Sequence, residues 1–254
     1  MALIYDTHAH YDDTAFDEDR DVLLAALPSK GVKAVIHAAT DPDSARFGLR
    51  LAERYPYIRV AVGIHPEAAH REQPDWLKQL EELAKDPRVC AVGEIGLDYH
   101  YPDGCPRGEQ IDLLRRQLEL AARLELPVIL HDRDAHEDTL TLLQEYRPRG
   151  VVHCFSGSVE MMRQITDLGL YIGLGGVTTF KNARRPAAVA AAVPIDRLLL
   201  ETDAPYMAPE PFRGKRCDSS LIAYTAAHIA ALRGLDTDTL LQQTAANAQR
   251  LFGV

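Results

Sequence analysis

Histidines and carboxylates of the kinds that bind metal ions stand at the ends of short apolar segments along this chain. The first group is Asp6-Thr7-His8-Ala9-His10. Because His8 and His10 are two residues apart in an extended segment, both imidazoles point to the same side. Two neutral imidazoles on one side can chelate one cation. The pair is equally compatible with two hydrogen-bonded core histidines.

Glu94 is the carboxylate in the most apolar surroundings, within Val92-Gly93-Glu94-Ile95-Gly96-Leu97. A charged group there is costly unless it is paired or bound to a cation. Its two oxygens can bridge two ions about 4 Å apart, the arrangement of two-metal hydrolytic centres. The structural alternative is an ion pair, for which Arg133 is the candidate partner.

Three further side chains close apolar segments. His131 and His153 end Val-Ile-Leu-His and Val-Val-His, and Asp203 lies in Glu201-Thr202-Asp203-Ala204-Pro205. An aspartate in such a place can ligate a metal and take a proton from an attacking water. We expect Glu201 to face the helix layer or a buried pair.

The combined set contains four imidazoles, two carboxylates and no thiolate. Such ligands suit Zn, Mn, Mg or Fe at an exchangeable hydrolytic centre, so ligand type alone does not name the ion. They are numerous enough for two ions that share Glu94. The candidate ligands are His8, His10, Glu94, His131, His153 and Asp203.

The elements that must position these residues alternate regularly. Eight β-branched or apolar segments begin near residues 3, 33, 58, 88, 127, 150, 170 and 197, a spacing of roughly 28 residues that is typical of one βα unit. Helical periodicity appears over 76–85, 111–124, about 219–232 and about 236–251. The pattern predicts a single-domain α/β protein over 1–254, a (β/α)8 TIM barrel, whose site lies at the carboxyl ends of its strands.

Composition narrows the class of protein. The chain has 254 residues, 46% of them hydrophobic, and a formal net charge of −9. An acidic protein of this kind is not a general duplex-coating protein, so any polyanion must be held by a local patch. The apolar runs fall far short of the ~20 residues of a membrane helix, and the start does not resemble a signal peptide. Four isolated cysteines indicate reduced thiols, and we expect a cytoplasmic monomer.

Basic and aromatic residues in loops are candidates for holding a nucleic acid. Arg213, Lys215 and Arg216 follow the last predicted strand, and Lys181, Arg184 and Arg185 follow the one before it. Both groups are expected on the active face, where they could hold phosphates, although a solvated basic loop explains them equally well. The tyrosines that could stack on bases, or play a structural role instead, are Tyr11, Tyr99 and Tyr206.

These motifs, in this order, resemble the TatD family of metal-dependent deoxyribonucleases, within the amidohydrolase-like TIM barrels. The resemblance runs along nearly the whole chain and includes Asp6-x-His8-x-His10, Gly63-Ile64-His65-Pro66, Gly93-Glu94-Ile95-Gly96-Leu97-Asp98, His131-x-Arg133-x-Ala135, His153-Cys154-Phe155-Ser156-Gly157, Glu201-Thr202-Asp203-Ala204-Pro205-Tyr206 and Asn247-Ala248-x-Arg250-Leu251-Phe252. One departure follows Arg213-Gly214-Lys215-Arg216. Here the chain reads Cys217-Asp218-Ser219, where the family usually continues with Asn and an acidic or amide residue before Pro.

The resemblance implies two metal sites. One ion would be held by His8, His10, Glu94 and Asp203, and the other by Glu94, His131 and His153, usually with Mg, Mn or Zn. It also implies exonuclease or endonuclease activity on DNA, and relatives are linked to repair, apoptotic DNA degradation and D-aminoacyl-tRNA deacylation.

The prediction is therefore a metal-dependent deoxyribonuclease, favoured as a 3′–5′ exonuclease on single strands or 3′ ends. Asp203 would deprotonate a water activated by two divalent ions, and Glu94 would bridge them. The candidates for substrate binding are His65, Arg133, Arg213, Lys215 and Arg216, with His65 alternatively supporting His8 and His10. The alternatives are RNA as substrate, an ester or amide hydrolase such as a D-aminoacyl-tRNA deacylase or lactonase, and a non-catalytic binding subunit.

Overall fold

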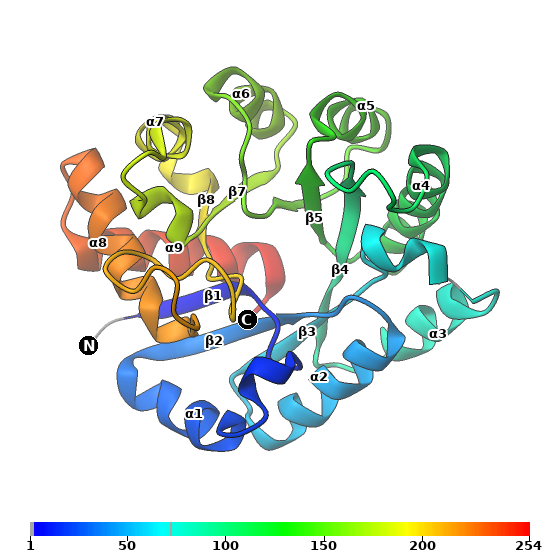
Figure 1. Cartoon of the computed structure of the whole chain (residues 1–254), viewed down its shortest axis with the longest axis horizontal. Helices are drawn as coiled ribbons and strands as arrows, with labels where there is room; N and C mark the ends of the chain where they lie inside the picture. Colours follow the sequence, from blue (N-terminus) through cyan, green and yellow to red (C-terminus); the bar gives the residue numbers. More distant parts are fainter. Residues whose placement is uncertain (1–2, 72) are drawn as a thin grey trace.

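The computed structural model describes residues 3–71 and 73–254. Eight strands form one sheet in chain order, and each strand pairs in parallel with the next. Helices lie around the outside of this sheet (Figure 1). The predicted (β/α)8 barrel is therefore confirmed. The strands are β1 (Ile4–Ala9), β2 (Val32–Ala38), β3 (Ile58–Val62), β4 (Val89–Asp98), β5 (Val128–Arg133), β6 (Gly150–Val152), β7 (Tyr171–Leu174) and β8 (Leu198–Leu200).

The helices follow the strands as a βα repeat requires. The described helices are α1 (Arg20–Ala26), α2 (Pro42–Arg54), α3 (Trp76–Leu83), α4 (Arg107–Leu124), α5 (His136–Tyr146), α6 (Val159–Asp167), α7 (Arg184–Ala192), α8 (Ile222–Arg233) and α9 (Thr237–Phe252). The four segments predicted as helical fall on α3, α4, α8 and α9. The third of them begins with a 3-10 turn at Ser219–Leu221, whose first turn is capped by the Asp218 carboxylate.

The barrel closes where its last strand meets its first. The amide of Asp203 donates to the carbonyl of His8 at 2.9 Å, and the amide of His10 donates to the carbonyl of Ala204 at 2.7 Å. Ala9 and Ala204 form a parallel bridge between these two hydrogen bonds. The seam of the barrel therefore runs through the segments that carry three of the candidate metal ligands.

Apolar side chains fill both the barrel and the layer outside it. All ten residues of β4 are buried, as expected for a strand that is covered on both faces. Inside the barrel, at least one buried residue from each of β2 to β8 joins a cluster with Leu251 and Phe252 of α9. Because side chains from seven successive strands meet only in the interior, α9 closes one end of the barrel and leaves the carboxyl ends of the strands to form the site.

Among residues 3–71 and 73–254, no helix combines the length and the hydropathy that a membrane span requires.

Candidate metal centre

A cavity of about 770 Å³ opens at the carboxyl ends of the strands. Five of the six candidate ligands line it, and the sixth, His8, is fully buried directly behind them. Strand-end placement explains the convergence, since equivalent ends of parallel strands meet at one rim of the barrel. The five lining ligands are His10, Glu94, His131, His153 and Asp203.

The two histidines of β1 lie as their spacing predicts. Their Nε2 atoms are 3.1 Å apart, and the Nδ1 atom of His10 lies 2.9 Å from the carbonyl oxygen of Ala38. A carbonyl oxygen only accepts, so Nδ1 of His10 carries the proton and its Nε2 presents a lone pair when the ring is neutral. Two ring nitrogens face one point, which suits a shared cation.

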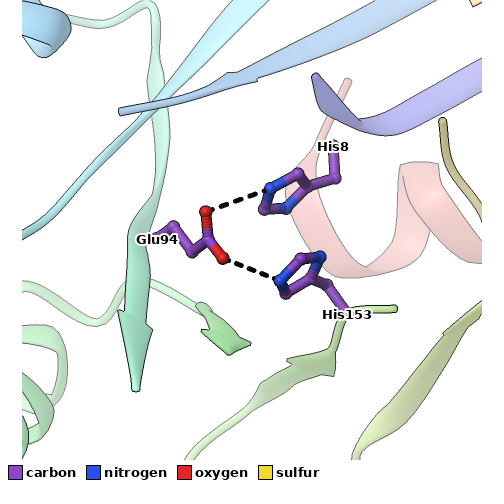
Figure 2. Close-up of side chains that lie close together, drawn as sticks. All are labelled: His8, Glu94 and His153. Atoms are coloured by element: carbon purple, nitrogen blue, oxygen red, sulfur yellow. Dashed lines mark ion pairs between the residues drawn. The ribbon is translucent and has the colours of Figure 1, made fainter. Parts of the chain in front are cut away.

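Glu94 stands between two groups of imidazoles and offers a different oxygen to each. Its Oε2 lies 3.3 Å from Nε2 of His8 and 3.5 Å from Nε2 of His10. Its Oε1 lies 2.7 Å from Nε2 of His153 and 2.9 Å from Nδ1 of His131. Figure 2 shows the carboxylate facing His8 and His153, one oxygen to each ring. Arg133, the alternative partner, approaches Asp98 at 3.9 Å instead.

Asp203 completes the His8 side of this centre. β8 ends at Leu200, three residues earlier than the predicted strand, and Asp203 adopts φ 61° just beyond it. This left-handed conformation directs the carboxylate into the cavity, where Oδ1 lies 3.2 Å from Nε2 of His10 and 3.6 Å from Nε2 of His8. The hydrogen bond that the Asp203 amide donates to the carbonyl of His8 fixes that position.

Carboxylates and imidazoles perturb each other strongly here. Burial raises the pKa of Glu94, but the imidazoles of His153, His65 and His8 outweigh it and hold the pKa well below the usual value. Burial lowers the pKa of His10, yet Asp203 and Glu94 raise it to about 9. The pKa of His8 falls to about 4 because burial dominates and His153 adds repulsion. Glu94 is therefore an anion, and His8 a neutral ring with a free lone pair.

The residues present fit divalent cations. Three groups each bring their ligand atoms within 4.8 Å of one another: His8 with Glu94 and His153, His8 with His10 and Asp203, and His65 with Glu94 and His131. Imidazole nitrogens and carboxylate oxygens are the donors of hydrolytic Zn and Mn sites. A cation among these groups would compensate the buried carboxylates of Glu94 and Asp203, whose charge is otherwise met by imidazoles.

His65 lies beside Glu94 and His131 in this centre. Its Nε2 is 3.5 Å from Oε1 of Glu94, and its ring meets that of His131 edge to face at 4.6 Å. The structure thus places it beside His131 and Glu94, and support of His8 and His10 by His65 stays a prediction. Its exposure to the cavity keeps the second expectation, contact with substrate, open.

Arg133 lines the cavity together with Tyr101, a residue that the sequence analysis did not single out. The guanidinium lies 5.2 Å from the centre of the Tyr101 ring and donates to its hydroxyl at 3.3 Å. Tyr101 is 50% exposed, so one face of a large ring is available at the mouth of the cavity. Sequence position alone gave no signal, because Tyr101 follows the strand end by three residues within a loop.

The other basic candidates lie elsewhere on this face. Among the described residues that line the cavity, Arg133 is the one arginine and there is no lysine. Arg216 pairs with Asp19 at 2.7 Å and lies over the Phe16 ring, while Arg213 lies over the Phe180 ring at 4.2 Å. Lys215 is exposed. Of the second basic group, Arg184 and Arg185 begin α7 and Lys181 precedes them.

The three tyrosines proposed for base stacking differ in burial and in hydrogen-bond partner. Tyr11 is fully buried and shares a 2.7 Å hydrogen bond with Ser219, which favours the structural role over stacking on a base. Tyr99 is half-buried and donates its hydroxyl to Asp138. Tyr206 lines the cavity, is 52% exposed and donates to Asp13 at 2.6 Å. Only loop geometry separates these cases, because all three follow strand ends.

Two buried carboxylates support the centre from behind. Asp98 lies 2.9 Å from Nε2 of His131, so that ring turns its Nδ1 toward Glu94. Glu201 accepts a hydrogen bond from the Cys154 amide, and burial raises its pKa to about 7. The prediction that Glu201 belongs to a buried pair agrees with its place beside His153, at 3.8 Å.

Comparison with known proteins places this geometry in a family. The family model described as TatD related DNase matches residues 5–253. The chain is 37% identical to the uncharacterized metal-dependent hydrolase YabD of Bacillus subtilis, over 99% of this chain and 100% of that protein. It is 34% identical to the 3′-5′ ssDNA/RNA exonuclease TatD of Salmonella typhimurium, over 99% of each chain.

Solved structures agree. The crystal structure of YJJV, a TatD homologue from Escherichia coli K12, superposes with a TM-score of 0.93 at 36% identity, covering 100% of this chain and 99% of that one. A TatD family hydrolase from Entamoeba histolytica superposes with a TM-score of 0.90 at 24% identity, covering 99% of both chains, a likeness of fold. The chain therefore belongs to the TatD family and is a metal-dependent hydrolase of ester bonds.

Proposed function

We propose that this protein is a nuclease that hydrolyses the terminal phosphodiester of a single strand from its 3′ end, using two divalent ions of Mg, Mn or Zn. One observation carries the proposal: the two oxygens of Glu94 face two separate groups of ligands. A carboxylate in that arrangement serves a pair of ions, and a pair of ions suits in-line displacement at phosphorus.

The ligand sets follow from the two sides of Glu94. His8, His10 and Asp203 would hold one ion with Oε2, and His131 and His153 would hold the other with Oε1. Bound there, the ions would supply an acidified water and neutralise the phosphate charge.

Asp203 is the residue proposed to orient that water and accept its proton. Its carboxylate lies at the cavity wall, and the neighbouring imidazoles of His10, His8 and His153 outweigh burial and lower its pKa. An ionised carboxylate at neutral pH is available as an acceptor without first losing a proton of its own.

Two exposed rings and one guanidinium favour an unstacked strand as substrate. Tyr101 follows β4 and Tyr206 follows β8, strands on opposite sides of the barrel, and both line the cavity. Aromatic rings stack on bases that are already separated, whereas duplex bases are stacked on one another. Arg133 lies at the same mouth and suits the scissile or adjacent phosphate. The likeness to the 3′-5′ ssDNA/RNA exonuclease of Salmonella typhimurium is consistent with this reading.

One observation favours a second candidate, hydrolysis of an aminoacyl ester such as a D-aminoacyl-tRNA. The lining holds one arginine but, besides Glu94 and Asp203, five further carboxylates: Asp12, Asp13, Glu67, Asp98 and Asp132. An acidic wall attracts the ammonium group of an aminoacyl ester and repels a long polyanion. The metal centre and the two tyrosines would serve either substrate, because both end in a nucleotide.

The test begins with protein stripped by EDTA and incubated with 3′-labelled single-stranded DNA, RNA or duplex, with Mg, Mn or Zn added back. We expect ion-restored release of mononucleotides from single strands, abolished in Asp203→Asn. Lys33→Ala, an exposed lysine of β2 outside the cavity lining, serves as the matched control and should retain activity.

Three other results would redirect the proposal. Release from internal positions would indicate an endonuclease. No cleavage of any strand by protein that still binds ions, together with hydrolysis of D-aminoacyl-tRNA, would favour the deacylase. Ion binding without hydrolysis of any of these substrates would favour a binding subunit. Light scattering of the same sample checks the expectation of a monomer.

A further inference from the structure

Each candidate ligand histidine has a second ring nitrogen, and the partner of that nitrogen sets the orientation of the ring. His10 has the Ala38 carbonyl and His131 has the Asp98 carboxylate, each at 2.9 Å. Nδ1 of His153 is buried and has no hydrogen-bond partner among the described residues. The acceptor that faces it is Oε1 of Glu201, at 3.8 Å.

One hydrogen bond and complete burial fix the side chain of Glu201 beside His153. Its Oε1 accepts a hydrogen bond from the amide of Cys154, the residue that follows His153. Its side chain is 1% exposed, and Oε2 is buried without a hydrogen-bond partner in the described structure. Burying a carboxylate with one oxygen that accepts no hydrogen bond costs free energy of folding. Packing alone therefore does not explain a glutamate at this position.

β7 makes room for this carboxylate. Glu201 follows β8 and His153 follows β6, and β7 lies between those strands in the sheet. A Cβ atom at Gly173 in β7 would lie 2.2 Å from Oε2 of Glu201 and 2.8 Å from its carboxyl carbon. Any other residue at 173 would displace the carboxylate, so the glycine is what lets Glu201 lie beside both neighbouring strand ends.

We propose that Glu201 is a positioning residue of the metal centre, whose carboxylate faces the Nδ1–H of His153 and keeps the Nε2 lone pair turned toward Glu94. The inference rests on the proposed ligand role of His153. Nε2 of His153 now lies 2.7 Å from Oε1 of Glu94, and an ion ligated between them would draw the ring into the orientation that Glu201 supports. A carboxylate behind an imidazole also makes it a stronger electron donor.

The competing explanation is purely structural: Glu201 holds the loop after β6 through the Cys154 amide and does nothing for the ion. Glu201→Gln separates the two readings, because the amide oxygen of glutamine still accepts from Cys154 but carries no charge. Gly173→Ala disturbs the same carboxylate from the opposite side. Thr244→Val, a buried polar-to-apolar change in α9, is the matched control.

The readout is binding of Mn²⁺ and Zn²⁺ to the stripped full-length protein, by calorimetry and elemental analysis, beside its thermal unfolding. We expect Glu201→Gln to lower the affinity for one of the two ions about 10- to 100-fold, while the affinity for the other changes by less than about threefold. The Tm of the stripped protein should not fall. Gly173→Ala should lower the affinity for the same ion, and Thr244→Val should leave the affinity for both ions unchanged.

The inference is overturned if both ions bind to Glu201→Gln as tightly as to the wild type. It is also overturned if both affinities fall together with a lower Tm, which is the structural reading. A wild type that binds a single ion would overturn the two-ion proposal separately. Glu201 would then be judged on that ion, and an unchanged affinity would overturn this inference as well.

Discussion

His8 and His153 stack face to face, with 3.8 Å between ring centroids and 7° between ring planes. They come from β1 and from the loop that follows β6, yet their Nε2 atoms meet the two different oxygens of one carboxylate, that of Glu94. The stacked rings therefore act as a spacer that keeps the two ligand groups of the centre adjacent but separate. This relationship makes Glu94 the residue on which both proposed ions depend.

Replacing Glu94 by Ala should remove both ions together. The remaining imidazoles would face one another without the shared anion, and their mutual repulsion would oppose binding of either cation. Elemental analysis after dialysis measures the stoichiometry. Glu67→Ala, a carboxylate of the same cavity outside the candidate ligand set, should keep both ions. Retention of either ion by Glu94→Ala would contradict the bridging role.

Removing metal should lower thermal stability, and adding it back should restore it. An ion that binds only the folded chain stabilises it by about 2.7 kcal/mol when its free concentration is 100 times its Kd. Differential scanning calorimetry in EDTA and in graded Mn²⁺ measures the effect. Asp203→Asn should show a smaller gain. A Tm that does not respond to millimolar ion would exclude a tight centre.

Arg133→Ala should reduce kcat/KM on single-stranded DNA by roughly 10- to 100-fold, because a charged hydrogen bond contributes about 1.5–3 kcal/mol. Arg216→Ala, which breaks the pair with Asp19, is the comparison and should leave kcat/KM nearly unchanged. Equal losses in both variants would indicate that the loop at residues 213–216 reaches the substrate.

Tyr101→Ala and Tyr206→Ala should each raise KM for an oligonucleotide, since stacking of one base contributes about 1–3 kcal/mol. Phenylalanine at either position should preserve most of the affinity. Hydrolysis of bis(p-nitrophenyl) phosphate, which has no nucleobase, should respond much less. A loss of the same size on both substrates would mean that the rings support the cavity wall and do not bind bases.

Glu201 should make the stripped protein less stable as pH rises. Burial raises its pKa from 4.5 to about 7, so the folded state holds the proton more tightly than the unfolded chain. The raised pKa therefore contributes fully to the free energy of unfolding below about pH 4.5, and this contribution is lost as pH rises through 7. Glu201→Gln should gain stability over wild type across that window, up to on the order of 3 kcal/mol. Urea unfolding at several pH values measures it, and a difference independent of pH would contradict the assignment.

The barrel and the convergence of its candidate ligands could be predicted because both depend on local patterns. Alternating strand and helix signals specify the fold, and in a barrel the end of a strand specifies one rim. The strand-end rule points to His8, His10, His131 and His153, and Glu94 stands out as a carboxylate in apolar surroundings. Asp203 was found by the same rule although β8 stops three residues before it, since the loop turns its carboxylate back into the cavity.

Contacts made between distant loops could not be predicted in this way. The ring of Tyr11 turns inward to Ser219, and Arg216 is held by Asp19, both partners far away along the chain. Tyr101 enters the cavity from a loop without periodicity. The place of Glu201 depends on a glycine in the neighbouring strand, which becomes visible only when the register of β7 and β8 is known.

The barrel seam has a consequence for biosynthesis. His8 and His10 leave the ribosome long before Asp203, whose hydrogen bond to the His8 carbonyl can form only after β8 has been made. An incomplete chain therefore exposes half a chelating site on an unclosed sheet edge, where it is both inactive and open to pairing with other strands. Synthesis of β8 and the loop after it closes that edge and brings Asp203 to the β1 histidines, so closure of the barrel and assembly of the candidate centre depend on the same segment.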